Sequence, residues 1–183
     1  MRMVLIITLL AGIISNMSLA HANKLGNFSE LQNMQSLAVQ AKQLQRPIML
    51  VFKADWCEYC ELLHEAVLAP MALSGLYNDY VIVRYVSVDD DKTIGDWQGK
   101  SVNKATLAYH LNADLTPTVV FLNHKGKEVA PRIVGIQEIT LYTNVIHRNL
   151  NLAYASMGIS TRIPVTVELL DKQSSRLNTQ LKQ

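Results

Sequence analysis

The chain contains two cysteines, Cys57 and Cys60, among 183 residues. A disulfide between them would close a very short loop. It would therefore add little stability, because a cross-link gains stability from the length of the loop it closes. A chemical role explains the pair better. The chemistry expected of such a pair is thiol–disulfide exchange, in which one thiolate attacks a disulfide and the other cysteine resolves the mixed disulfide.

The elements around the pair supply what a reactive thiolate needs. Residues 48–52 form a short apolar run, typical of a strand buried on both faces. A helical pattern follows Cys57 as far as about Leu68, and we expect Pro70 to interrupt or end it. Cys57 is thus predicted at a helix N-terminus, where free backbone N–H groups and the helix dipole stabilise negative charge. We expect Cys57 to attack and Cys60, one turn further on, to resolve.

The rest of the chain alternates helices and strands. The pattern predicts a strand–helix–strand unit followed by a hairpin and a closing helix, which is an α/β fold with a central mixed sheet flanked by helices on both faces. The further elements expected are a helix over 28–45, a strand over 80–88, a polar loop over 89–101, a helix over 102–111, strands over 118–122 and 128–134 joined by a turn, and a helix over 136–155.

A second feature bears on the cysteines. Pro117 follows Thr116 at the start of a predicted strand, and an X–Pro bond is the only kind that is often cis. A cis bond would turn the Thr116 backbone toward the cysteines and offer its edge groups to an extended substrate. An ordinary trans proline entering a strand is the alternative that the residues alone leave open.

The segments 52–60 and 115–122, with Gly126 and Gly135, resemble the thioredoxin superfamily over roughly residues 31–149. Within it they are similar to exported thioredoxin-related proteins of the sulfur-oxidation type and to the C-terminal periplasmic domain of the transmembrane thiol–disulfide reductase. The resemblance implies the thioredoxin fold, a cis Pro117, an exposed nucleophile at Cys57 and a resolving Cys60. It implies protein thiols and disulfides as partners, a membrane electron donor, and no cofactor, since the electrons travel through sulfur.

The chain departs from the superfamily pattern below the cysteines. Val51 stands six residues before Cys57, where cytosolic thioredoxins carry a buried aspartate. A proton acceptor for Cys60 must therefore come from elsewhere. His64, four residues after Cys60, would lie on the same helix face. It is either a substitute base or an ordinary, partly exposed helix residue.

The residues around the pair also bear on its redox direction and its substrates. Glu58 and Glu61 bring negative charge close to Cys57, and like charge opposes thiolate formation. We therefore expect a reductant or isomerase-side electron donor and not a strong oxidant. Trp56 and Tyr59 flank the pair and, with Thr116, are expected to contact substrates; packing is the alternative role for the two aromatic residues.

The N-terminus has the pattern of an export signal. Arg2 precedes an apolar run over residues 4–14, and Ala20-His21-Ala22 offers small residues for cleavage. We expect a signal peptide over 1–22, cleavage after Ala22, no stable membrane insertion afterwards, and a periplasmic location. An uncleaved anchor is the alternative.

The remaining expectations concern domains and excluded classes. We expect a thioredoxin-like domain over 23–155 and a partly mobile C-terminal extension over 156–183. With 49% hydrophobic residues, 17% charged residues and a net charge of +2, the chain is globular and not a nucleic-acid binder. The polar run Asp89-Asp90-Asp91 indicates a solvated turn, and no metal site is expected there.

Three other functions remain open from the sequence. Cys57, Cys60 and His64 could form a copper or zinc site in a metal-handling module, although such a site has no use for Thr116 and Pro117. The chain could also be a non-catalytic binding domain, or a cytochrome c maturation reductase.

Overall fold

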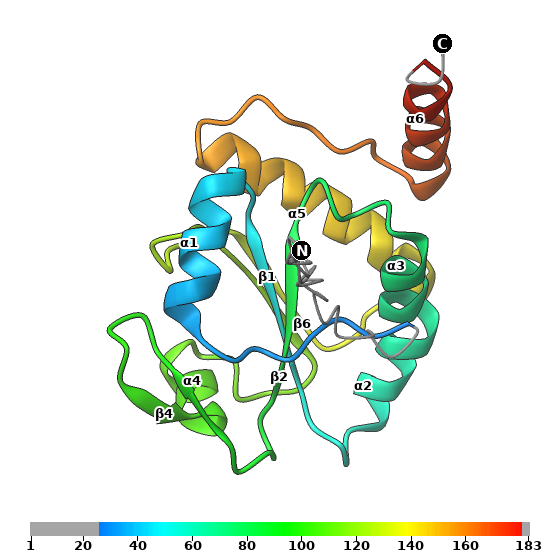
Figure 1. Cartoon of the computed structure of the whole chain (residues 1–183). Helices are drawn as coiled ribbons and strands as arrows, with labels where there is room; N and C mark the ends of the chain where they lie inside the picture. Colours follow the sequence, from blue (N-terminus) through cyan, green and yellow to red (C-terminus); the bar gives the residue numbers. More distant parts are fainter. Residues whose placement is uncertain (1–25, 181–183) are drawn as a thin grey trace, which may run out of the picture.

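Four strands form the central sheet of the computed structural model, which describes residues 26–180 (Figure 1). The strand order is β2-β1-β5-β6; β1 and β2 are parallel, and the other neighbours are antiparallel. The elements are α1 (Met34–Leu44), β1 (Ile48–Lys53), α2 (Glu58–Leu63), a π-helical turn (His64–Leu68), α3 (Ala69–Ser74), β2 (Ile82–Ser87), β3 (Thr93–Gly95), β4 (Ser101–Asn103), α4 (Lys104–His110), β5 (Thr118–Leu122), β6 (Glu128–Val134), a 3-10 turn (Ile139–Leu141), α5 (Tyr142–Ser156) and α6 (Val167–Gln180).

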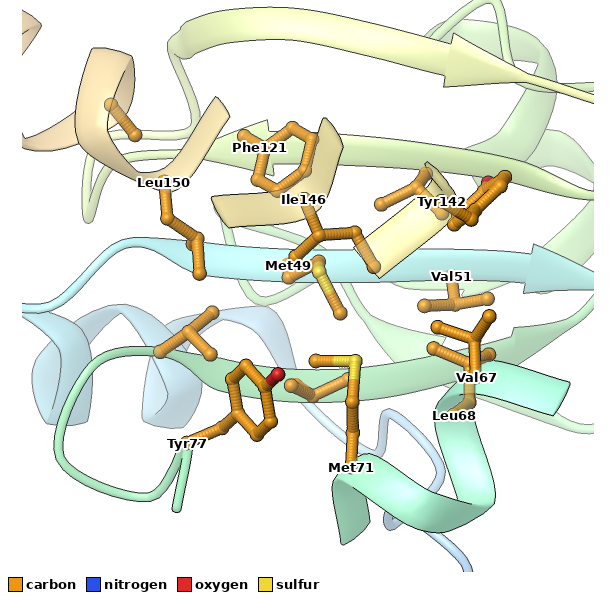
Figure 2. Close-up of a cluster of buried hydrophobic side chains, with 14 of the residues drawn as sticks. Met49, Val51, Val67, Leu68, Met71, Tyr77, Phe121, Tyr142, Ile146 and Leu150 are labelled. Atoms are coloured by element: carbon orange, nitrogen blue, oxygen red, sulfur yellow. The ribbon is translucent and has the colours of Figure 1, made fainter. Parts of the chain in front are cut away.

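Helices cover both faces of this sheet, as predicted. Side chains alternate along β1, so that Met49 and Val51 face the helices α2, α3 and α5, while Leu50 and Phe52 face α1 and α4. Figure 2 shows the first of these layers, where Met49 and Phe121 on the strands meet Ile146 and Leu150 of α5. Burial on both faces explains why β1 and β5 have almost no polar residues.

The predicted strands are confirmed most closely at the centre of the sheet. The strands expected over 118–122 and 128–134 are β5 and β6 with the same bounds, and β1 is one residue longer than expected. The strand expected over 80–88 is shorter, since β2 covers Ile82–Ser87.

The helix expected over 28–45 was predicted too long. Asn33 is the N-cap of α1, and its side-chain oxygen accepts a hydrogen bond from Ser36 N at 2.9 Å. The residues before it are extended and lie along the edge of β2. Leu31 N donates to Tyr85 O at 2.8 Å, and Tyr85 N donates to Ser29 O at 3.0 Å.

Of the two expected effects of Pro70, interruption is found and termination is not, because α2 gives way to a π-helical turn just before Pro70. Helical backbone continues through α3 to Ser74, with Pro70 in the first turn of α3. Proline is tolerated there because the backbone N–H groups of a first turn have no partner within the helix. The turn His64–Leu68 before it is π-helical, and Ala69 N donates to His64 O, five residues back.

The segment expected as a polar loop over 89–101 contains structure. β3 and β4 pair as a small antiparallel hairpin, and α4 begins only at Lys104, after the Asn103 N-cap. Asp90 is not simply solvated, because it pairs with the buried Lys104 at 2.8 Å. Trp97, at the tip of this hairpin, lies against Gly126 in the β5–β6 turn, so it anchors the loop.

The C-terminal extension also folds. The closing helix, expected over 136–155, is a 3-10 turn followed by α5. Beyond it, Ile163 is buried against the body of the protein, and α6 packs through Leu170. Figure 1 shows α6 at the opposite end of the molecule from the start of α2. The predicted signal segment, residues 1–22, lies outside the described residues. Between residues 26 and 180 no helix has the length and apolar character needed to cross a membrane.

Candidate active site

The loop between β1 and α2 holds the cysteine pair in a fixed position. Cys57 N donates to Ala54 O at 3.2 Å, which closes a tight turn directly after β1. The carboxylate of Asp89, just after β2, accepts a hydrogen bond from Asp55 N at 2.6 Å. The hydrogen bonds at the ends of β1 and β2 therefore fix the position of Cys57 at the start of α2.

Cys57 and Cys60 form a disulfide in this structure. Cys57 is the N-cap of α2, as predicted, and its Sγ accepts a hydrogen bond from Cys60 N at 3.2 Å. When the pair is reduced, the same N–H and the helix dipole favour a thiolate on Cys57. The expected difference in exposure is not seen in the disulfide form, because Cys57 is 8% and Cys60 7% exposed.

The Thr116–Pro117 peptide bond is cis, as the resemblance implied. Thr118, the next residue, pairs with Phe52 in the sheet, so Pro117 lies at the edge where β1 ends and the cysteine loop begins. Pro117 O accepts a hydrogen bond from Gly135 N at 2.8 Å, and Thr118 Oγ1 donates to Leu115 O at 2.6 Å. Both bonds fix this loop beside the cysteine loop.

A polar cavity of about 310 Å³ lies beside Cys60. We call it the Cys60 cavity; its walls include Lys53, Asp55, Cys60, Glu61, His64 and Tyr85. His64 is half-buried there, and its Nδ1 lies 3.1 Å from the Tyr85 hydroxyl. Tyr85 is buried, and burial raises the pKa of its hydroxyl, so it stays protonated. The structure thus brings His64 into the wall that Cys60 faces, while Val51 is buried in the core.

Trp56 and Tyr59 are largely exposed on either side of Cys57. Their exposed fractions are 74% and 64%, so packing in the core does not account for either residue. Their expected contact with substrates, like that of Thr116, stays a prediction.

Two residues of the site were missed by sequence reasoning. Tyr85 and Asp89 reach it only because β2 lies parallel to β1 in a register that pairs Val51 with Tyr85. A signal was present, since both residues lie in or directly after the second predicted strand. In the part of the chain that the structure describes, no group of three or more His, Cys, Asp and Glu side chains is arranged to hold a metal ion.

Comparison with known protein families now identifies the fold. The model of the thioredoxin-like domain matches residues 34–148, which is more than half of the chain and includes both cysteines and Pro117. The chain belongs to the thioredoxin-like family. A CxxC disulfide at the start of the helix that follows β1 in this fold is the arrangement of a thiol–disulfide oxidoreductase, and the prediction of such an enzyme is confirmed.

Individual relatives are distant. The chain is 23% identical over 134 residues to the thiol:disulfide interchange protein DsbD of Actinobacillus pleuropneumoniae serotype 5b (strain L20). The match covers 70% of this chain and 21% of the relative, so the chain spans about a fifth of that protein.

A solved structure supports the fold. The structure titled DsbH oxidoreductase matches with a TM-score of 0.53 and 16% identity, over 69% of this chain and 87% of that one. Oxidised thioredoxin O2 from Arabidopsis thaliana matches with a TM-score of 0.47 and 23% identity, over 67% and 94%.

Proposed function

We propose that this protein is an exported oxidoreductase that works in the periplasm and reduces disulfides of partner proteins. The observation that carries the proposal is the Cys57–Cys60 disulfide at the start of α2, at the same sheet edge as the cis Pro117. In the reduced state, Cys57 would attack a partner disulfide and form a mixed disulfide with one partner sulfur. Cys60 would then attack Cys57 Sγ, which releases the partner as a dithiol and restores the disulfide seen here.

His64 is the proposed proton acceptor for Cys60. Cys60 must lose its proton before it can attack, and His64 lines the same cavity. In the tautomer whose Nδ1 donates to the Tyr85 hydroxyl, Nε2 is free to accept that proton. The cavity has room for a water molecule to carry the proton between the two side chains. Tyr85 then acts as a positioning residue for the imidazole.

The acidic surroundings support the reducing direction. Glu58 and Glu61 are exposed within one turn of Cys57, where their charge opposes the thiolate and so disfavours the reduced form. A pair whose reduced form is less favoured gives up its electrons more readily. A dithiol donor at the membrane would return the pair to the reduced state, and the similarity to part of an interchange protein supports such a donor.

Trapping of the mixed disulfide tests the proposal. In a Cys60→Ser variant, Cys57 can attack but nothing resolves the product, so partner proteins should stay attached until a reductant is added. The matched control is Cys57→Ser, which should trap far less. If neither variant traps partners, and the native protein instead carries copper or zinc that both substitutions remove, the metal-handling alternative holds.

A further inference from the structure

The surface around the disulfide combines exposed aromatic and aliphatic side chains. Trp56 and Tyr59 stand beside Cys57, and Leu115, in the loop before Pro117, is 67% exposed. Large apolar side chains with so much exposure next to a reactive centre offer contact area to a partner. This apolar surface alone does not say which partner it fits.

Carboxylates surround the same surface and are largely uncompensated. Residues 53–65 hold four carboxylates, Asp55, Glu58, Glu61 and Glu65, against one lysine, in a chain whose net charge is +2. Lys53 is already paired with Asp55 at 3.3 Å. Among the ion pairs found within residues 26–180, none involves Glu58, Glu61 or Glu65. The negative charge is therefore available to a partner.

Helix stability does not explain all of this charge. Glu58 and Glu61 lie in the first turn of α2, where the helix dipole stabilises a negatively charged carboxylate. Asp55 precedes the helix, and Glu65 lies beyond its first turn. A further carboxylate, Asp89, is held against the cysteine loop by its bond to Asp55 N. The carboxylates are thus distributed around the disulfide and are not confined to the N-terminus of α2.

We infer that this site selects protein disulfides flanked by lysine or arginine over those flanked by acidic residues. The inference rests on the proposed reductase function. Complementary charge steers the encounter and raises its rate, and a like-charged partner is disfavoured. An arginine of the partner could also lie over the exposed ring of Trp56. The reaction is balanced: the protein dithiol becomes a disulfide, the partner disulfide becomes a dithiol, and two electrons and two protons pass to the partner.

Three matched peptides test the inference. Each carries one disulfide and a fluorophore–quencher pair, and they differ only in whether lysine, glutamine or glutamate flanks the cysteines. Reduced, full-length protein is mixed with each peptide at low ionic strength, and each rate is divided by the rate with dithiothreitol. This division removes the effect of the flanking residues on the peptide's own thiol pKa. We expect the lysine peptide to react about tenfold faster than the glutamate peptide, with the ratio approaching one at high salt.

Variants assign the effect to the carboxylates. A Glu58→Gln/Glu61→Gln variant should lose most of the lysine-over-glutamate ratio, whatever the overall change in Cys57 reactivity. Asp171→Asn is the matched control, because Asp171 is exposed on α6 at the far end of the molecule, and it should leave the ratio unchanged. Equal normalised rates for the three peptides, or a ratio that the double variant keeps, would overturn the inference while the reductase proposal stands. If no peptide is reduced, both fail.

Discussion

At the residue scale, the second half of the exchange depends on where Cys60 sends its proton. Besides the paired Lys53 and Asp55, the Cys60 cavity offers His64 and the exposed Glu61 as bases. We expect His64→Gln to slow resolution of the mixed disulfide about tenfold at pH 7. This loss is smaller than the full contribution of a general base, because water in the open cavity can accept the proton in place of His64. Stopped-flow fluorescence of the reaction with a small disulfide measures this rate.

The variant Tyr85→Phe distinguishes the proposed base, His64, from the hydroxyl that positions it. It removes the hydroxyl that lies 3.1 Å from His64 Nδ1 but keeps the imidazole. The rate of resolution should fall less than in His64→Gln, because the imidazole is still present to accept the proton. A His64→Gln variant that resolves the mixed disulfide at the native rate would assign the proton to Glu61 or to solvent.

The cysteine pair could be predicted from spacing, and the residues that support it could not. Cys57, Cys60 and the proposed proton acceptor His64 lie in one helical segment, and a helix brings residues four apart onto one face. The cis bond before Pro117 was implied by the family resemblance and not by spacing. Tyr85 lies in a different strand, and its approach to His64 depends on the β1–β2 register. Register is set by the packing of the whole sheet, so the sequence around either residue does not reveal this contact.

At the element scale, the β3–β4 hairpin is attached to the sheet through Trp97. A Cβ added to Gly126 would lie 2.6 Å from the Trp97 ring, and Gly126 has φ +77°. We expect Gly126→Ala to cost about 1–2 kcal/mol for the backbone and about 1–3 kcal/mol more for displacing the ring. Urea unfolding measures the total, and Trp97 fluorescence should change in the folded state.

Gly158→Ala is the matched control. Gly158 has φ +71°, but among residues 26–180 no atom beyond its immediate neighbours lies within 4 Å of the added Cβ. It should therefore show the backbone cost alone and leave the tryptophan emission as it is. Equal losses of stability in the two variants would show that Trp97 does not hold the hairpin in solution.

The elements that were predicted wrongly share a cause. β1, β5 and β6 are specified by apolar runs and a turn, which are local signals. The extended pairing of Ser29 and Leu31 with Tyr85, and the hairpin over 93–103, depend on partners distant in the chain. Helical spacing at residues 28–33 was therefore overridden by the open edge of β2.

At the scale of the whole molecule, His147 joins the domain to its C-terminal extension. It is fully buried on α5; its Nδ1 donates to Pro164 O at 2.6 Å, and its Nε2 accepts from the Tyr77 hydroxyl at 2.8 Å. Burial and the charge of Glu168 raise the pKa of Tyr77 to about 12, so it remains a donor. Burial lowers the pKa of His147, and this outweighs the opposite effects of Pro164 O and Glu168.

This depressed pKa makes stability depend on pH. The neutral imidazole is favoured by folding, so its contribution is fully present above the unfolded value of about 6.5 and is lost as the pH falls through the folded pKa. We expect the urea midpoint of the native protein to fall between pH 7.5 and pH 5. His147→Gln should be less stable at pH 7.5 and lose less on acidification. An equal pH dependence in both proteins would contradict this role.

The reduction potential of the Cys57–Cys60 pair tests the central claim most directly. The protein is equilibrated with dithiothreitol or glutathione buffers, and the fraction of disulfide is read after alkylation of the free thiols. The account predicts a value near that of thioredoxin, about −270 mV, as suits a reductase whose thiolate is opposed by Glu58 and Glu61. A value near −120 mV, that of a strong oxidant, would contradict the reducing direction and the role given to those carboxylates.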